Sequence, residues 1–395
     1  MIPRRRFLRA VLEATAVVGA NAGLPARAAE PPDAVLEVKA FPRACVAGLY
    51  VHTIWSDGRH NGFPGIARVG DFYYVTFRNA DSHQAPESKI VVIRAKADDL
   101  KKWEKVAEWT RDHDCRDPLV FDNHGKVQVV FHSKEDFYSQ SADGVTWSEP
   151  RELETEFVAP KPDSNLTFSS KRRWLFRIRR GPDGAFYSLA RCGIKEKESR
   201  STFGLILFRS EDGVKFKALH TYGEGPTRGM GKDNVGSGWG HEADVAWTPD
   251  GTLVSAIRNS FPGVIVFSPF DSAQGKVAPQ GPWRAFSTGA NNFGGPALHA
   301  TRQGGILLAA RDVREPRADG FPAACKVWTV TENGAENPWF IPSGGDCAYQ
   351  SFADGPGEEV LLCYYSSHEF SQPKGAGFNP ANIYLAHLKV RHREP

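Results

Sequence analysis

Several features that would define other protein classes are absent from this sequence. The six cysteines are irregularly spaced and form no CxxC pair, which excludes a thiolate zinc site and a disulfide scaffold. After the N-terminal segment, no apolar run is long enough to cross a membrane, and no amphipathic stretch reaches three helical turns. There is no HExxH motif, and we expect neither a cofactor nor a metal ion. The 38 glycines and 27 prolines instead predict an all-β fold with many turns.

Residues 1–29 have the pattern of an export signal. Arg4-Arg5-Arg6-Phe7-Leu8-Arg9 is a twin-arginine motif, residues 10–24 are weakly apolar, and Ala26-Arg27-Ala28 offers a cleavage site. The alternative is a basic tail on a cytosolic protein. We expect export to the periplasm or the exterior, with residues 30–395 as one propeller domain and a monomer.

The positive charge of the chain lies mainly in this signal. Removing residues 1–28 takes away five arginines and one glutamate, so the formal net charge falls from +3 to about −1. We therefore expect the mature protein to bind neither nucleic acid nor a membrane surface.

Six glycine turns recur along the chain, each followed by an apolar strand that ends in a polar residue. Consecutive turns are roughly 50 to 70 residues apart, about one four-stranded propeller blade each. The turns are Gly70-Asp71, His124-Gly125, Asp183-Gly184, Asp250-Gly251, Gly304-Gly305 and Asp354-Gly355. They predict a six-bladed β-propeller of four-stranded antiparallel blades. We expect the blades over about 56–110, 111–160, 165–225, 238–290, 291–340 and 343–392, with the segment from Glu30 to about Tyr50 as a leader and lead-in to the first.

Two other turns, Ser141–Trp147 and Ser210–Phe216, have the Asp-box sequence. In this motif the serine and aspartate side chains bond the turn backbone, and the aromatic residue packs beneath it. Asp143 and Asp212 are therefore expected to be structural. Residues 97–109 have some helical periodicity, but their place between two strands favours a similar turn.

Blade geometry brings two sets of polar residues to one face. The innermost strand of a blade starts on that face and the second strand ends on it, and loop-borne function collects there. Strand ends supply Arg78, His132, Arg191, Arg258, Arg311 and Tyr365, and strand starts supply His60, Asn61, Arg116, Asp117, Trp174, Arg177, His241, Glu242, Asn291, Asn292, Asp346 and Tyr349. So many arginines at one channel mouth favour an anionic ligand, and planar guanidinium groups suit the carboxylate of an acidic sugar. The alternative is that each arginine pairs with an acidic residue of a neighbouring blade.

This layout resembles the sialidase superfamily over nearly the whole mature chain. Glu242 and Arg258 stand where sialidases have a glutamate and a triad arginine, Tyr349 stands where they have the nucleophile, and Arg78 closes the first hairpin. The motifs Phe77-Arg78 with His83, Pro342–Asp346 with Tyr349, Tyr364–Glu369 and Ile383–Ala386 are similar to those of bacterial sialidase-like proteins.

Two positions depart from the sialidase pattern. His83 stands where the acid/base aspartate is expected, and Gly62-Phe63-Pro64 replaces the Arg-Ile-Pro sequence, so one triad arginine is missing.

The resemblance implies a retaining exo-glycosidase. Tyr349 would be the nucleophile, Glu242 its base and His83 the acid, with Asp81 or Asp117 as orienting partners of His83. The expected substrate-binding residues are Arg78, Arg258, Arg311, Arg177, Arg116, Asp117, His60 and Asp346. Arg177 or Arg116 would compensate for the missing arginine, and His368 and Glu369 would be rim groups.

Three functions stay open. The first is hydrolysis of a terminal carboxylated sugar such as sialic acid, and the second is a polysaccharide lyase acting on uronic acids. The third is non-catalytic binding of an acidic sugar, in which Tyr349 lines the channel, His83 only contacts the ligand and Glu242 only pairs with an arginine.

Overall fold

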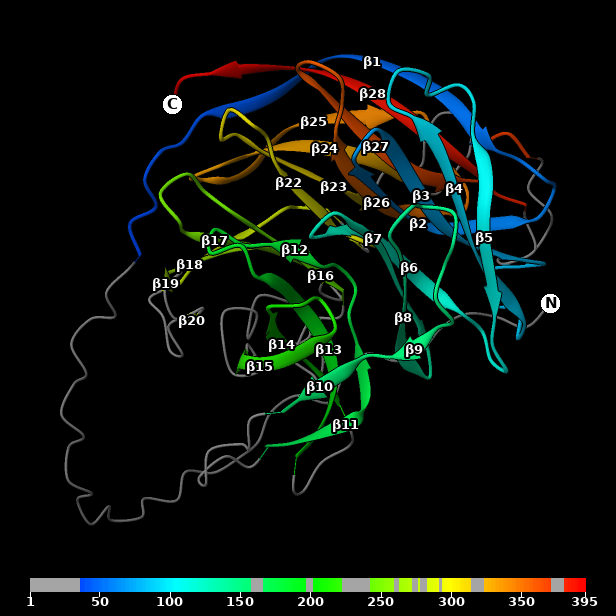
Figure 1. Cartoon of the computed structure of the whole chain (residues 1–395). Helices are drawn as coiled ribbons and strands as arrows, with labels where there is room; N and C mark the ends of the chain where they lie inside the picture. The colour runs from blue at the N-terminus through cyan, green and yellow to red at the C-terminus, as the bar shows by residue number, and fades with distance from the viewer. Residues whose placement is uncertain are drawn as a thin grey trace, which may run out of the picture. The chain divides into compact units, whose positions relative to one another are not determined.

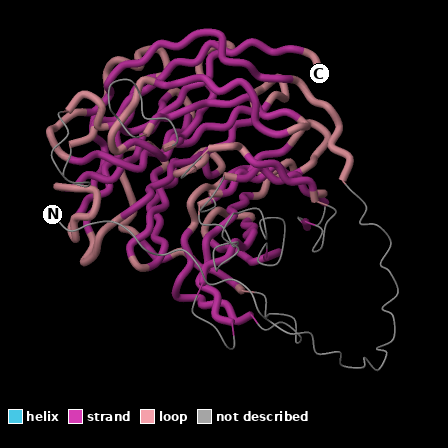
Figure 2. The backbone as a smooth tube through the Cα atoms, turned by 180° about the vertical axis from the view of Figure 1, so that it is seen from behind, coloured by secondary structure: helices cyan, strands magenta, loops and turns pink. Residues whose placement is uncertain are grey.

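The computed structural model describes residues 36–157, 166–196, 202–221, 242–258, 263–271, 276–277, 283–290, 293–313, 323–370 and 380–395. The predicted signal peptide, His241, Asn291 and Asn292 lie outside these residues. All described strands belong to the unit Val35–Pro395. No helix in the described part of the chain is long and apolar enough to span a membrane, and strands dominate these residues (Figure 2).

The described strands form six antiparallel blades in sequence order (Figure 1). The first blade contains β2 (His60–Val69), β3 (Phe72–Ala80), β4 (Ser88–Lys96) and β5 (Glu104–Thr110). The second contains β6 (Arg116–Asn123), β7 (Lys126–Ser133), β8 (Glu135–Ser141) and β9 (Arg151–Glu152). The third contains β11 (Leu166–Trp174), β13 (Phe186–Glu196), β14 (Thr202–Ser210) and β15 (Lys215–Thr221). The fourth blade contains β16 (Ala243–Trp247), β17 (Leu253–Ile257), β18 (Val264–Ser268) and β21 (Arg284–Ser287). The fifth contains β22 (Ala297–Ala300), β23 (Ile306–Asp312), β24 (Ala324–Thr331) and β25 (Gly334–Ile341). The sixth contains β26 (Cys347–Asp354), β27 (Glu359–Ser366), β28 (Asn382–Arg393) and β1 (Arg43–Trp55). The predicted six-bladed propeller is confirmed.

Four short strands add to this plan. β10 (Glu154–Glu156) pairs in parallel with β15 and β12 (Arg179–Arg180) pairs with β13, so the third sheet has six strands rather than four. β19 (Phe270–Asp271) and β20 (Lys276–Val277) form a small separate hairpin.

Alternation along each strand places the hydrophobic core between blades. In β4, Ile90 and Val92 pack toward the second blade, whereas Val91 and Ile93 pack toward the sixth. Successive strand residues point to opposite faces, so a blade that is apolar on both faces needs a neighbour on each side. Six such apolar clusters join the blades pairwise, including the sixth to the first.

β1 corrects the expectation for the N-terminal segment. Residues 43–55 do not lead into the first blade but form the outermost strand of the sixth, paired with β28 from Arg43–Arg393 to Trp55–Ile383 (Figure 1). The blade that contains the C-terminal strand is thus completed by a strand from near the N-terminal end of the described residues. Sequence periodicity identifies strands but not their partners, so the expected order missed this pairing.

The turn predictions mostly hold. Gly70, Gly125, Gly184, Gly251 and Gly304 have positive φ at the expected hairpins, but in the sixth hairpin this conformation is at Gly357 rather than Gly355. The turn expected over residues 97–109 is shorter than predicted: it ends before Glu104, and residues 104–109 belong to strand β5.

The turn at Ser141 is held by its own side chains. The Ser141 hydroxyl accepts from the Gly144 N–H (2.8 Å), and Asp143 accepts from Val145 N–H (2.8 Å) and Thr146 N–H (2.7 Å). Ser210 and Asp212 bond the Gly213, Val214 and Lys215 N–H groups in the same way. All six cysteines are free.

Ala44 tests the importance of the closing strand. It is fully buried on β1, and a Cβ at Gly305 would lie 2.7 Å from the Ala44 Cβ, so no room exists for a larger side chain. We expect Ala44→Leu to lower the free energy of unfolding by about 1–3 kcal/mol through overpacking. Urea denaturation measures this change. The exposed Ala47 on the same strand is the control, and Ala47→Leu should change stability by less than about 0.5 kcal/mol. Equal effects of the two substitutions would contradict the closing role of β1.

Candidate active site

In three blades the start of the inner strand lies beside the end of the second strand. The pairs are Gly62 with Arg78, Arg116 with His132, and Ala348 with Tyr365. The third blade differs from the expectation, because Trp174 is the last residue of β11 and pairs with Arg191 in the middle of β13. In the fourth blade the Arg258 N–H donates to the Glu242 carbonyl oxygen (2.8 Å). These polar residues therefore share one side of the propeller, which we call the entry face.

Three inner strands carry a β-bulge whose first residue has positive φ. These residues are Phe63 (58°) in β2, Asp117 (45°) in β6 and Tyr349 (52°) in β26. Gly295 (58°) has the same conformation just before β22. Residues other than glycine rarely adopt it, and bulges near active sites re-aim a side chain. The backbone therefore marks Phe63, Asp117 and Tyr349 as the residues that leave the regular alternation.

Tyr349 and Glu242 form the central contact of the entry face. The Tyr349 hydroxyl donates to Glu242 Oε1 (2.7 Å), and Arg258 Nη1 donates to the same oxygen (2.6 Å). The backbone N–H of Gly295 donates to Oε2 (2.7 Å). A Cβ at Gly295 would lie 2.6 Å from the Tyr349 Cα, so glycine is needed for this approach. Glu242 thus joins the fourth, fifth and sixth blades.

Burial and charge set opposite protonation states in this pair. Burial raises the pKa of Tyr349 well above its usual range, and the charges of Glu242 and Asp117 add to the effect. Burial also acts to raise the pKa of Glu242, but Arg258, the Tyr349 hydroxyl and the Gly295 N–H hold it below its ordinary value. A neutral phenol therefore faces an ionised carboxylate that can accept its proton.

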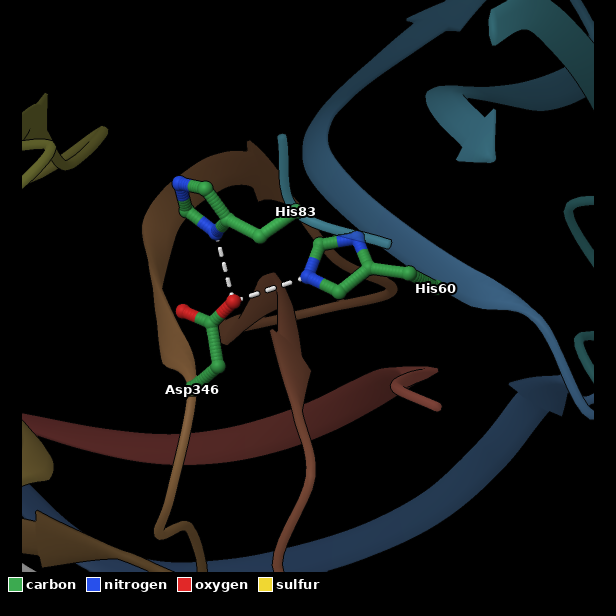
Figure 3. A group of neighbouring side chains, drawn as sticks. All are labelled: His60, His83 and Asp346. Atoms are coloured by element: carbon green, nitrogen blue, oxygen red, sulfur yellow. Dashed lines mark hydrogen bonds and ion pairs between the residues drawn. The ribbon is translucent and has the colours of Figure 1, made fainter. Parts of the chain in front are cut away.

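His83 is held by Asp346 and not by either partner expected from sequence. His83 Nδ1 lies 2.5 Å from Asp346 Oδ2, and His60 Nε2 lies 2.8 Å from the same oxygen (Figure 3). The Tyr365 hydroxyl donates to Oδ1 (2.9 Å). Asp81 instead pairs with Arg59 at 3.0 Å and is mostly exposed. The hydrogen bonds from His60 and His83 hold the pKa of Asp346 far below its usual range against the effect of burial.

Two arginines fix the loop that carries His83. Arg78 donates to Asp114 (2.8 Å) and to the carbonyl oxygens of Ser82 (2.9 Å) and Ala85 (3.2 Å). Arg116 also binds Asp114 and donates to the His83 carbonyl oxygen (2.8 Å). Asp114 is the acidic partner that sequence reasoning missed.

The expected substrate-binding residues fall into two groups by exposure. Arg78 and His60 are fully buried, and Arg177 is also buried, with its Nη2 donating to the Gln350 carbonyl oxygen (2.7 Å). In this structure these three side chains are held within the protein, and their expected contact with a substrate stays a prediction. Arg116, Arg258 and Arg311 are half-buried, as is Arg191, which the expected set left out.

Arg191 and Phe63 were not among the expected site residues, although Arg191 was among the strand ends expected on this face. Burial lowers the pKa of Arg191, and the nearby carboxylate of Glu242 acts against that effect. Phe63 packs edge-on against His83 (5.3 Å between ring centroids) and Tyr349 (4.7 Å), so it lies between the two. A repeated X-Pro step after the strand start, as in Phe63-Pro64 and Asp117-Pro118, was the available signal.

His368 and Glu369, expected as rim groups, line a pocket that contains neither Tyr349 nor Glu242. The pocket has a volume of about 350 Å³ and is also lined by Pro342, Tyr384 and residues of β1.

Among the described residues, His60, His83 and Asp346 are a group that could hold a metal ion, because their ligand atoms lie within 4.8 Å of one another. On a tetrahedral zinc ion, with bonds of about 2.0–2.1 Å, such atoms would be about 3.3 Å apart. The observed N–O distances of 2.8 and 2.5 Å are those of hydrogen bonds. The geometry thus fits a hydrogen-bonded network better than a set of zinc ligands.

The sequence matches no protein-family model and no curated protein. Solved structures do match. A protein of unknown function from Dyadobacter fermentans aligns with a TM-score of 0.64 at 16% identity, over 88% of this chain and 100% of that one. The Trypanosoma rangeli sialidase gives 0.55 at 12%, over 87% of this chain and 60% of that one. The parainfluenza virus 5 hemagglutinin-neuraminidase with the ligand DANA gives 0.54 at 7%, over 88% and 95%. The chain has the fold of the sialidases.

The buried carboxyl group of Asp117 makes the stability of the protein depend on pH. Asp117 is buried, its Oδ1 has no hydrogen-bond partner, and burial together with Glu242 raises its pKa from 3.8 to about 7. The folded state therefore binds this proton more tightly than the unfolded chain does, and wild-type stability falls as the pH rises from about 4 to 7. We expect Asp117→Asn to gain stability relative to wild type across this window and to keep a constant advantage above it. Urea midpoints between pH 4 and 8 measure the trend. A difference that does not change with pH would contradict it.

Proposed function

We propose that this protein is a retaining, exo-acting glycoside hydrolase of the sialidase type that releases a terminal carboxylated sugar such as sialic acid. The observation that carries the proposal is the 2.7 Å contact between Tyr349 and Glu242, with Arg258 on the same carboxylate oxygen. A sugar with a carboxylate beside its anomeric carbon repels an anionic nucleophile. A neutral tyrosine avoids this repulsion and is a known exception to the two-carboxylate rule.

The reaction would run in two steps. In the first, Tyr349 Oη attacks the anomeric carbon as Glu242 takes the phenol proton, and His83 protonates the leaving oxygen through Nε2. In the second, His83 removes a proton from water, which attacks the anomeric carbon, and Glu242 returns its proton to the tyrosine oxygen. His83 is suited to the acid role because Asp346 holds its Nδ1 and leaves Nε2 for the substrate.

Arg258, Arg311 and Arg191 are the proposed carboxylate-binding residues, because they are half-buried on the entry face. Arg116 and Asp117 would contact other parts of the sugar. We assign Arg78 the role of fixing the His83 loop rather than of binding substrate, since all three of its nitrogens donate within the protein.

A uronate lyase is the second candidate, and the pairing of His83 with Asp346 beside Phe63 favours it. A neutral His83 would remove the C5 proton of a uronic acid and the C4–O bond would break. A double bond then forms between C4 and C5, and the departing oxygen takes a proton from a neighbouring group or water.

One experiment separates these functions. The mature protein is incubated with an aryl α-sialoside and with a panel of uronate polysaccharides, while dye release and near-ultraviolet absorbance are followed. Dye release supports the hydrolase, and absorbance from a new double bond without dye release supports the lyase. Saturable binding of an acidic sugar without either signal would overturn both enzymatic proposals in favour of a binding protein.

Tyr349→Phe tests the nucleophile on the substrate that is turned over. The variant keeps the ring that packs on Phe63 but loses the attacking oxygen, so we expect kcat to fall on the order of 10³-fold or more. Sugar binding, measured by calorimetry, should remain within about threefold because the arginines are unchanged. Tyr50→Phe is the matched control, since Tyr50 is exposed on the outer strand of the sixth blade. Full activity of Tyr349→Phe would remove Tyr349 from the mechanism.

We further propose that the turns at Ser141 and Ser210 are Asp boxes and that residues 1–29 direct export by the twin-arginine route. N-terminal sequencing of the exported protein should find a start just after residue 28. Intact protein in the cytoplasm would contradict the export proposal.

A further inference from the structure

Asp346 binds two histidines through one oxygen, and this sharing fixes the hydrogens of both rings. An ionised carboxylate only accepts hydrogen bonds, so His60 Nε2 and His83 Nδ1 must each carry a hydrogen in their contacts of 2.8 and 2.5 Å. Tyr365 occupies the other oxygen at 2.9 Å. His83 Nε2 is then the nitrogen left for a substrate (Figure 3).

The two histidines differ in their exposure to solvent. The His60 side chain is 1% exposed and the His83 side chain 28% exposed. Burial lowers the pKa of His60 despite Asp346, and His60 Nδ1 is buried without a hydrogen-bond partner. A proton on that atom would be an unsatisfied buried charge, so His60 stays a neutral donor.

Other charged and titratable groups face this network from the surrounding strands. Arg78 opposes protonation of His60 from β3, Arg116 lies on the His83 carbonyl from β6, and Tyr365 closes Asp346 from β27. Tyr349 lies across the Phe63 ring. None of these offers His60 Nδ1 a partner, whereas His83 Nε2 is the ring nitrogen that Asp346 leaves for a ligand.

The network depends on the residue that replaces the missing arginine. A Cβ at Gly62 would lie 2.9 Å from His60 Cε1. The ring has no room to retreat, because it is fully buried with Phe63 and Tyr365 at centroid distances of 6.3 and 5.7 Å. An arginine at position 62 and the His60–Asp346 contact therefore exclude each other.

We propose that His60 is a positioning residue that holds Asp346 on His83 and thereby fixes the His83 tautomer. The His60 ring occupies space that would be closed by any residue other than glycine at position 62. The proposal deepens the proposed function, because it says how the acid of that site is held. It also explains the lost arginine and the histidine in place of aspartate as one structural change.

The first test needs no substrate. Proton NMR of the histidine-labelled protein should show two hydrogen-bonded imidazole N–H signals, on His60 Nε2 and His83 Nδ1. His60→Phe should remove the first signal and shift or broaden the second, whereas His60→Gln, which keeps a donor, should retain the second. Gly62→Ala should act like His60→Phe, and Gly48→Ala should change nothing, since its new Cβ would meet only Lys389 at 3.6 Å.

The second test uses the substrate found above. We expect His60→Phe to lower kcat about 10- to 100-fold with little change in KM and to move the pH dependence of kcat/KM, with His60→Gln restoring most of the loss. A purely structural role would leave the pH profile in place.

Three results would overturn the proposal: a His83 ring protonated on Nε2 alone, a His83 signal unaffected by His60→Phe, or one equivalent of Zn²⁺ abolishing both signals by binding as a metal site. If no sugar is turned over, the proposed function fails but the NMR outcome still decides the role of His60.

Discussion

Every blade of this propeller is apolar on both faces, and the rest of the structure depends on covering them. Residues such as Ile90 and Val91 alternate between the two neighbouring clusters, so no blade can be the last of an open row. The apolar cluster between the sixth and first blades meets this requirement, and β1, from near the N-terminal end of the described residues, completes the sixth blade. Closure thus brings distant segments together and sets the geometry of the entry face.

The same requirement limits where functional groups can stand. Within the strands, alternation sends most side chains into apolar clusters, and buried polar ones such as Thr76 and Gln128 hydrogen-bond within the protein. Side chains that face the channel mouth therefore need a break in the pattern. The bulges at Phe63, Asp117 and Tyr349 supply it through positive φ angles. Glu242 then joins three blades through Arg258, Gly295 and Tyr349, which makes the position of the proposed nucleophile depend on the ring as a whole.

The position of an arginine in the sequence pattern does not say whether its side chain lies on the entry face or holds a loop. Arg78 fits the sialidase pattern in sequence, yet the structure uses it to hold the loop of His83 through Asp114 and two carbonyl oxygens. Such partners are backbone oxygens or an acidic residue of a turn, and neither carries a recognisable signature. Gly62 is the opposite case. In the sequence it is only the position where an expected arginine is missing, but in the structure its lack of a side chain leaves the space that the His60 ring occupies.

Local patterns in the sequence determined the strands, the turns, the number of blades and the side on which strand starts and ends meet, because each depends on residues close together in the chain. The resemblance to sialidases, rather than these patterns, singled out Tyr349, Glu242 and His83. Only the tertiary structure decided the partners. Tyr349 and Glu242 are 107 residues apart, and His60 and Asp346 are 286 apart. Contacts over such separations exist because the ring closes, and closure is a property of the packed blades that no single segment encodes.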